Sequence, residues 1–128
     1  MRYPISMKLL IVDDQIKTRR SLAILFKTVP GVDEIYEAGD GLSALSAARE
    51  LHPDVVLMDA RMPFMDGLTA TRMLKSEWPK VKVIVLSMYM EYQYIADLSG
   101  ADAFVSKGEP PEKLVEMFGK ITAAAPQI

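Results

Sequence analysis

The sequence predicts an α/β fold in which five parallel strands form one doubly wound sheet and five helices cover its two faces. Five short apolar runs alternate with five amphipathic stretches along the 128 residues. Strict alternation of strand and helix implies parallel strands joined by right-handed crossovers. Five such strands favour the flavodoxin-like order 2-1-3-4-5, whose switch point lies between the first and third strands.

The strands are expected at 7–12, 34–38, 55–58, 81–86 and 102–105. The third run is entirely apolar and too short for a helix of its own, which is typical of a strand buried on both faces. The second run is more polar, and this favours a place at the edge of the sheet. A turn containing Pro63 follows the third strand, and Asp66 is expected to cap the next helix.

Each helix is expected to turn an apolar face toward the sheet, at the spacing of i, i+3, i+4 and i+7. The first helix is expected at 15–28, before Pro30-Gly31, and Gly100 fits the C-terminal cap of a short fourth helix. The inward-facing residues, helix by helix, are Leu22, Leu25, Phe26 and Val29; Ala44, Ala47, Ala48 and Leu51; Ala70, Met73 and Leu74; Ile95 and Leu98; and Leu114, Met117, Phe118 and Ile121.

Length and composition bound the function. We expect one domain at 7–122, an N-terminal extension at 1–6 and a C-terminal tail at 123–128. A net charge of -2 gives no electrostatic reason to bind nucleic acid or a membrane surface. The absence of cysteine excludes disulfides and thiolate metal sites. No apolar run approaches the roughly 20 residues of a membrane helix, so a soluble, cytoplasmic protein is expected.

Five polar residues follow the apolar runs and are expected on one rim of the sheet: Asp13, Asp14, Asp59, Ser87 and Lys107. Three converging carboxylates repel one another, and Mg²⁺ suits such an oxygen-rich site. Lys107 can bind a phosphoryl oxygen or pair with Asp59, and Ser87 can donate a hydrogen bond. A carboxylate can serve as the nucleophile in phosphoryl transfer, which would make Asp59 an aspartyl-phosphate.

Each of these residues also has a plain structural interpretation. Asp13 and Asp14 could cap the first helix, and Asp59 could be a turn residue at a strand end. Ser87 could form the turn into the fourth helix, and Lys107 alone would usually be a solvated surface charge. The functional interpretation rests on the set as a whole.

The chain resembles the receiver domains of two-component response regulators, which have a CheY-like fold. The motifs that carry the resemblance are Val12-Asp13-Asp14, Met58-Asp59, Met62-Pro63-Phe64-Met65-Asp66-Gly67, Leu86-Ser87 and Val105-Ser106-Lys107. The segment Leu86-Ser87-Met88-Tyr89 is most similar to the corresponding segment of regulators with a helix-turn-helix output domain of the LuxR or NarL type. The resemblance covers residues 7–121.

The resemblance implies that a histidine kinase or phosphotransfer protein phosphorylates Asp59. It implies that Asp13, Asp14, Asp59 and the backbone carbonyl of Arg61 hold Mg²⁺. Lys107 and Ser87 would contact the phosphoryl group. Ser87 and Phe104 match the switch residues, and Phe104 replaces the commoner tyrosine. Gly108 stands where the family often has proline.

Arg61 and Tyr89 match positions that influence the hydrolysis rate of the phosphorylated aspartate in the family. We hypothesise that this bulky pair shields the acyl phosphate from water. The alternative is that both side chains simply point to solvent.

A phosphoryl group adds roughly -1.5 to -2 charge, and we expect it to alter the face formed by the fourth helix, fifth strand and fifth helix. Tyr92, Tyr94 and Lys113 are candidates for a partner or phosphorylation-dependent homodimer contact there. Ile16 in the first helix is either an exposed anchor for the kinase or a core residue. The basic residues of that helix are interpreted as a solvated face rather than a DNA site; they are Lys17, Arg19, Arg20 and Lys27.

Two other functions stay open at this point. A pseudo-receiver would keep the fold as a binding module without the chemistry. A metal-dependent phosphohydrolase of the haloacid dehalogenase type would carry a second acid two residues after the nucleophile, where this chain has Arg61. We expect a domain that catalyses its own phosphorylation and dephosphorylation, with no dedicated enzyme activity.

Overall fold

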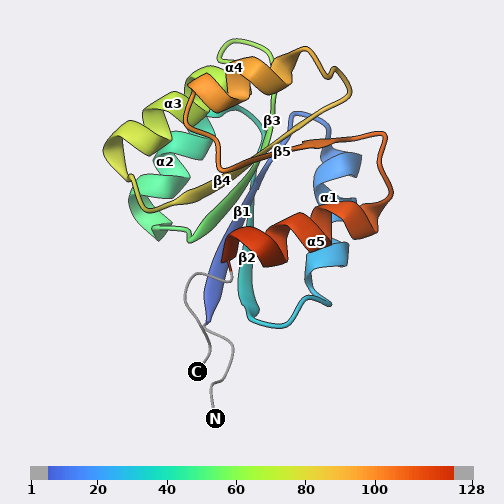
Figure 1. The fold of residues 1–128 in the computed structure, drawn as a ribbon. Coiled ribbons are helices and arrows are strands. Elements are labelled where there is room, and N and C mark those ends of the chain that lie inside the picture. Colours follow the sequence, from blue (N-terminus) through green and yellow to red (C-terminus); the bar gives the residue numbers. More distant parts are fainter. Residues whose placement is uncertain (1–5, 123–128) are drawn as a thin grey trace.

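A computed structural model describes residues 6–122 and shows five strands that alternate with five helices (Figure 1). The strands are β1 Met7–Val12, β2 Val32–Ala38, β3 Val55–Asp59, β4 Lys82–Ser87 and β5 Ala103–Ser106. The helices are α1 Ile16–Phe26, α2 Gly41–Leu51, α3 Gly67–Glu77, α4 Tyr92–Leu98 and α5 Pro111–Thr122. The expected N-terminal extension, apart from Ser6, and the expected tail lie outside the described residues.

The sheet has the predicted order β2-β1-β3-β4-β5, and all its neighbouring strands are parallel. Every residue of β3 is buried, in keeping with its apolar sequence and central position. The more polar β2 lies at the edge, as predicted. Because β1 and β3 are neighbours although a whole strand and two helices separate them in sequence, their carboxyl ends meet.

Alternate residues of each strand supply two separate cores. Leu10 and Val12 of β1 face a core completed by α2, α3 and α4, whereas Leu9 and Ile11 face one completed by α1 and α5. In the second core Phe26 and Phe118 pack edge to face, with ring centroids 5.0 Å apart. The helices therefore lie on both faces of the sheet (Figure 1), and the loops between strands and helices are left to form the functional rim.

Two of the predicted helix caps are confirmed. The Asp66 carboxylate accepts a hydrogen bond from the Thr69 amide at 2.8 Å. Gly100, which follows α4, has φ of +92°, a conformation that glycine adopts without strain. Element boundaries differ from prediction by one or two residues at several ends. The start of β2 at Val32 reflects its pairing with Met7, which the polar sequence of that stretch concealed.

The predicted inward face of α4 is wrong. Ile95 is 44% exposed and Leu98 is 68% exposed, and Ala96 is the one fully buried residue of this helix. Met73 of α3, also expected inside, is 44% exposed. A seven-residue helix has too few apolar positions for spacing to define a unique face. The result is an exposed apolar surface beside the functional rim.

Candidate functional site

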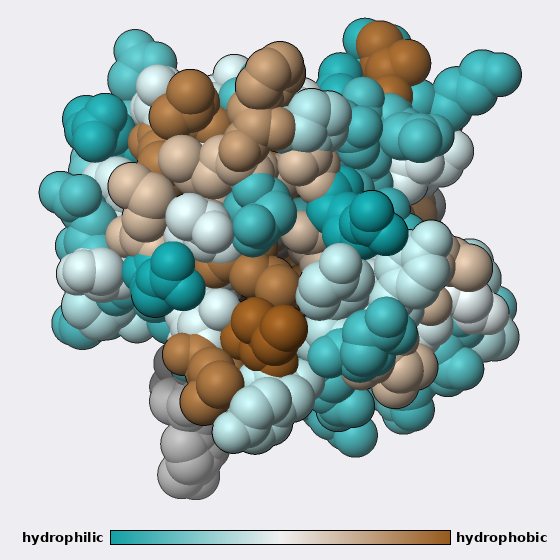
Figure 2. Space-filling model, turned by 90° about the horizontal axis from the view of Figure 1, so that it is seen from above, coloured by the Kyte–Doolittle hydropathy of each residue, from teal (hydrophilic) through white to brown (hydrophobic). Residues whose placement is uncertain are grey.

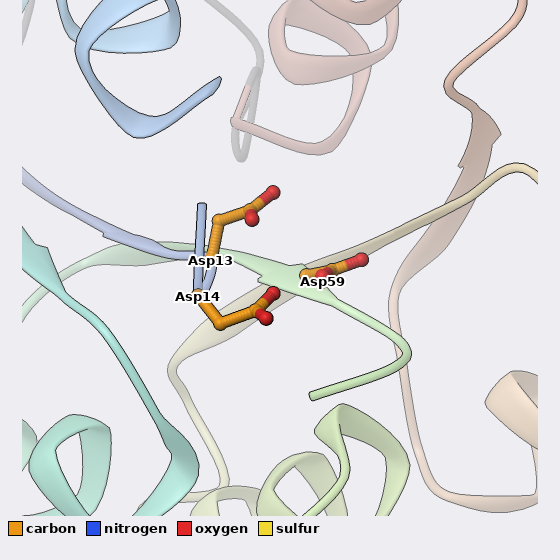
Figure 3. A group of neighbouring side chains, drawn as sticks. All are labelled: Asp13, Asp14 and Asp59. Atoms are coloured by element: carbon orange, nitrogen blue, oxygen red, sulfur yellow. The ribbon is translucent and has the colours of Figure 1, made fainter. Parts of the chain in front are cut away.

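The structure gathers the predicted polar residues at the carboxyl edge of the sheet. Asp13 and Asp14 follow β1, Asp59 ends β3, Ser87 ends β4, and Lys107 follows β5. Figure 3 shows the carboxylates of Asp13, Asp14 and Asp59 pointing into the same space beyond the ends of β1 and β3. One oxygen from each lies within 4.8 Å of the others. Asp13 and Asp59 are buried, whereas Asp14 is exposed.

Lys107 joins two of these carboxylates. Its Nζ lies 3.0 Å from Asp13 Oδ2 and 3.0 Å from Asp59 Oδ1. Its backbone amide donates to the carbonyl of Ser87 at 2.8 Å, which fastens the loop after β5 to the end of β4. The interpretation of Lys107 as a solvated surface charge is therefore wrong.

Burial and charge set the protonation behaviour of this pair. Burial raises the pKa of the Asp59 carboxyl above its ordinary value; the hydrogen bond from Lys107 opposes this rise, and the charges of Asp13 and Asp14 add to it. Burial alone would lower the pKa of the Lys107 ammonium, but the hydrogen bonds to Asp13 and Asp59 outweigh it and hold the pKa above its ordinary value. Lys107 thus remains a fixed cation in the site.

Asp13 is held at its backbone and at its side chain. Its Oδ1 accepts a hydrogen bond from the Gln15 amide at 2.9 Å, and its own amide donates to Ala38 at 3.1 Å. Its carbonyl accepts from Arg19 Nη1 at 2.8 Å. Asp13 does not cap α1, whose N-cap is Gln15 and has no side-chain cap. Its two carboxylate oxygens have different partners, the Gln15 amide and Lys107, and its role in holding a metal stays a prediction.

The first turn of α3 packs directly on the backbone of Asp59. The Gly67 amide donates to the Ala60 carbonyl at 2.9 Å, and a Cβ at Gly67 would lie 1.8 Å from the Asp59 carbonyl oxygen. No side chain fits at that separation, so glycine is required for this approach. The sequence predicts Gly67 only as a residue at the start of a helix, and the contact of Gly67 with Asp59 was not predicted.

Ser87 and Phe104, the predicted switch residues, lie below the loop after β4. The buried Ser87 hydroxyl accepts a hydrogen bond from the Tyr89 amide at 3.0 Å, so the predicted turn role is present. Phe104 is half-buried and packs against the core beneath α3 and α4.

Arg61 and Tyr89 contact each other instead of extending separately into solvent. The Arg61 guanidinium carbon lies 5.2 Å from the centroid of the Tyr89 ring, within the range of a cation–π contact. Tyr89 in turn meets Tyr92 edge to face, with centroids 6.2 Å apart. This chain of contacts connects the loop after β3 to the start of α4, beside a cavity of 480 Å³ that Pro63 and Asp66 also line.

Part of this rim carries exposed apolar side chains. Phe64 is fully exposed at a φ of +71°, a conformation that L-residues rarely adopt. Met88 and Met90 are 61% and 56% exposed. Figure 2 looks down on this edge from above, and its brown residues lie mainly in the left and centre of the view, on the side where Figure 1 places α3 and α4.

The residues present fit a hard divalent cation. Asp13, Asp14 and Asp59 together supply oxygen donors of the kind that Mg²⁺ prefers, and the exposed Asp14 leaves one side open to water. Lys107 offsets part of the carboxylate charge from the opposite side. Each carboxylate contributes one oxygen to a space small enough for a single ion.

Comparison with known proteins assigns this constellation to a family. Residues 9–119 match the response regulator receiver domain. The chain belongs to the response regulator receiver family. The resemblance drawn from the sequence is thereby confirmed, and the chain is a receiver domain of the two-component type.

Two curated relatives are similar to this receiver over most of its length. It is 38% identical over 112 residues to the transcriptional regulatory protein YhcZ of Bacillus subtilis, covering 86% of this chain and 52% of YhcZ. It is 35% identical over 127 residues to the response regulator GacA of Pseudomonas aeruginosa, covering 94% of this chain and 59% of GacA. The receiver thus spans little more than half the length of these relatives.

Solved structures agree with the fold. A two-component response regulator of the LuxR family from Aurantimonas superposes with a TM-score of 0.87 at 28% identity, covering 92% of this chain and 86% of that one. A LuxR-family DNA-binding response regulator from Staphylococcus aureus gives 0.82 at 31% identity, covering 90% and 98%. Within residues 6–122 of this receiver, none of the helices has the length and apolar character that crossing a lipid bilayer requires.

The sequence interpretation of Arg19 is also wrong. This residue was counted in a solvated basic face, yet its side chain is only 16% exposed and pairs with Glu37 as well as with the Asp13 carbonyl. Composition and helical spacing could not reveal a bond to a backbone atom. Its place one helical turn beyond Gln15, on the helix that follows the acidic pair, was the available signal.

Proposed function

We propose that this receiver accepts a phosphoryl group on Asp59, with Mg²⁺ bound, and passes the signal to the face formed by α4, β5 and α5. The observation that carries the proposal is Lys107 Nζ, which lies 3.0 Å from both Asp13 and Asp59. An ammonium fixed between a buried nucleophile candidate and a metal-ligand candidate is what stabilisation of a transferring phosphoryl group requires.

The residues divide the work by position. An Asp59 carboxylate oxygen attacks the phosphorus of a phosphohistidine, the phosphorus–nitrogen bond breaks, and the imidazole leaves with the bonding electrons and takes up a proton. Lys107 then pairs with a phosphoryl oxygen, and the Ser87 hydroxyl donates to another. Asp13, Asp14, Asp59 and the Arg61 carbonyl would hold Mg²⁺, which supplies positive charge beside the phosphoryl oxygens.

The proposed switch depends on the loss of the hydrogen bond between the Tyr89 amide and the Ser87 hydroxyl. At rest its hydroxyl oxygen accepts a bond from Tyr89; when it turns toward a phosphoryl group, the loop after β4 moves and Phe104 can turn inward. A switch from 1:99 to 99:1 needs about 5.5 kcal/mol of differential interaction. Charge-assisted hydrogen bonds of about 1.5–3 kcal/mol each, made by Ser87 and Lys107, are of the right size.

The phosphodonor is a histidine kinase or phosphotransfer protein that approaches the α1 side. Ile16, left open between core and surface by the sequence, is 54% exposed. Beside Lys107 a groove of 420 Å³ runs between α1 and α5, with Leu22, Leu25 and Pro110 among its lining residues. We take the exposed Ile16 side chain and this apolar groove as the surface on which the protein donor docks.

The face formed by α4, β5 and α5, at the β5 edge of the sheet, suits a second receiver. Tyr94 is 70% exposed and Lys113 is exposed, and Phe104 and Lys113 line a shallow groove with Met90 and Gln93. We assign the phosphorylation-dependent homodimer contact to this face. Because the relatives named above include transcription regulators, we also assign the receiver to a cytoplasmic helix-turn-helix regulator of transcription, with DNA contacted by the output domain and not by the receiver.

The direct test is phosphorylation by acetyl phosphate in Mg²⁺, read by intact mass and by trapping of the aspartyl-phosphate. The wild-type chain should gain one phosphoryl group, and Asp59→Asn should gain none. Asp54→Asn is the matched control, because Asp54 lies at the opposite end of β3 and bonds to Lys8. A folded wild-type chain that takes up no phosphoryl group from acetyl phosphate, and binds no beryllium fluoride as a phosphoryl analogue, would instead be a pseudo-receiver.

A further inference from the structure

Arg19, in the first part of α1, reaches back to the acidic loop that precedes its own helix. Its Nη1 donates to the Asp13 carbonyl oxygen at 2.8 Å. Its Nε donates to Glu37 Oε1 of β2 at 3.0 Å. The two contacts use different nitrogens of one planar guanidinium, so fixing the guanidinium on Glu37 also fixes the direction of the bond to Asp13.

The carbonyl that Arg19 holds belongs to the peptide bond between Asp13 and Asp14. Rotation of that peptide would move both carboxylates relative to Asp59. Asp13 has other restraints, through its amide and its side chain. Asp14 is exposed, so the peptide that precedes it matters most for where its carboxylate lies.

We propose that Arg19 is a positioning residue for the cation site, acting on Asp14 and Asp13 through the peptide that joins them. The inference rests on the proposed function in that it takes Mg²⁺ as the ion. Arg19 touches neither the ion nor the phosphoryl group in this scheme. It orients the backbone from which two of the three carboxylates project, with Glu37 as its anchor.

Positioning and charge predict opposite results, and this makes the inference testable. Arg19 is a cation near a cation site, so a purely electrostatic role would mean that its removal tightens Mg²⁺ binding. A positioning role means that its removal weakens Mg²⁺ binding, because the carboxylates lose their common orientation. Residues that orient metal ligands typically change affinity by about tenfold or more when removed.

Arg20 provides the matched control. It is the next residue in α1, carries the same charge and also reaches Glu37, with Nε 3.4 Å from Oε2. Its side chain is 66% exposed, and among the described residues its one ion pair is with Glu37. Arg20→Ala therefore removes an equal charge and part of the Glu37 pairing while leaving the Asp13 carbonyl bonded.

The experiment is calorimetric titration of Mg²⁺ into the unphosphorylated chain, at low ionic strength, for wild type, Arg19→Ala, Arg19→Lys and Arg20→Ala. We expect the Mg²⁺ dissociation constant to rise by about tenfold in Arg19→Ala, by less in Arg19→Lys, and not to rise in Arg20→Ala. The rate of phosphorylation by acetyl phosphate should stay near the wild-type rate in the control variant Arg20→Ala.

A spectroscopic measurement separates positioning from general loosening. In metal-free ¹H–¹⁵N spectra the Asp14 amide should shift in Arg19→Ala and stay in place in Arg20→Ala, because that amide shares its peptide with the bonded carbonyl. Glu37→Gln, which keeps an acceptor of the same length, should raise the Mg²⁺ dissociation constant less than Arg19→Ala does.

The possible outcomes decide different claims. An unchanged or tighter Mg²⁺ affinity in a folded Arg19→Ala chain overturns the inference while the proposed function stands. If Arg19→Ala does not fold, an Arg19→Lys chain with wild-type affinity overturns it equally. A wild-type chain that binds no Mg²⁺ refutes the proposed cation site itself.

Discussion

On the α1 side of Asp59, Asp13 has several hydrogen-bond partners. Lys107 and Gln15 donate to its carboxylate, and Arg19 donates to its backbone carbonyl. On the α4 side, the loop after β3 exposes Phe64, and the Ser87 hydroxyl accepts one hydrogen bond, from the Tyr89 amide. The same rim is thus tightly connected on one side of the nucleophile candidate and sparsely connected on the other.

The contrast teaches which half can change. Charge stabilisation works best when dipoles and ions are already in place, so the α1 side suits the binding of charged groups beside Asp59. A switch needs a segment whose contacts are few enough to exchange, and the α4 side meets that condition. The division lies at β3, whose residues are all buried and whose last residue is Asp59.

The largest effect is expected where α3 meets Asp59. Gly67→Ala would place a methyl carbon 1.8 Å from the Asp59 carbonyl oxygen, so the backbone must move, and we expect a loss of about 3 kcal/mol of unfolding free energy, or failure to fold. Gly119→Ala in α5 is the control, since nothing lies within 4 Å of its added carbon; it should stabilise by about 0.5–1 kcal/mol. Urea titration measures both, and equal values for the two would refute the close approach.

The next effect concerns charge on the connected side. Because the pKa of the Asp59 carboxyl is raised in the folded chain, the folded state binds more protons there than the unfolded state. Metal-free stability should therefore fall as pH rises through the folded pKa of Asp59. Asp59→Asn should flatten that fall and be more stable than wild type at neutral pH.

Thermal unfolding in a chelator, followed from pH 4 to pH 8, would measure this difference. Adding Mg²⁺ should reverse it, since an ion at a hundred times its dissociation constant stabilises by about 2.7 kcal/mol and Asp59→Asn lacks one ligand. Wild-type stability that rises over the same pH range without metal would contradict the proposed cost of the third carboxylate.

A smaller effect is expected at the exposed loop after β3. Phe64→Asn should raise the unfolding free energy by about 0.5–1 kcal/mol, because asparagine adopts left-handed backbone more readily and a fully exposed phenyl ring loses no burial. Phe64→Ala keeps the positive φ and should bring no such gain. A chain destabilised by the asparagine would show that the ring makes a stabilising contact.

A stability effect of similar size, with a kinetic readout, is expected at the cation–π pair. An exposed pair of this kind contributes about 0.5–1 kcal/mol, so Arg61→Asn and Tyr89→Ala should barely change the melting temperature. Each should shorten the half-life of the aspartyl-phosphate if the pair shields it from water. An unchanged half-life in both variants would dismiss the shield, and Tyr94→Ala, an exposed tyrosine on α4, serves as the control.

The sequence predicted the convergence of the site because alternating strands and helices fix which ends of the strands share a rim. Asp13 and Lys107 meet although 94 positions separate them, since each directly follows a strand. What could not be predicted depends on contacts that no residue pattern encodes. The bond from Arg19 ends on a backbone oxygen, and the approach of Gly67 depends on the angle at which α3 leaves β3.

The exposure of Ile95 and Leu98 has the same origin. Periodicity shows that a helix has an apolar stripe but not whether the stripe faces the sheet, and α4 is too short for the sheet to impose its direction. The fold and the residues that meet at the carboxyl edge of the sheet were therefore predictable. The way in which α4 packs on the sheet was not.

An ammonium that already bridges two acids has a further consequence for the resting protein. The folded chain carries its own internal counter-ion at Lys107, so its architecture does not depend on capturing a metal. Under the proposed function a dication would bind and leave without refolding of the chain, and readiness to accept a phosphoryl group would follow the supply of that ion.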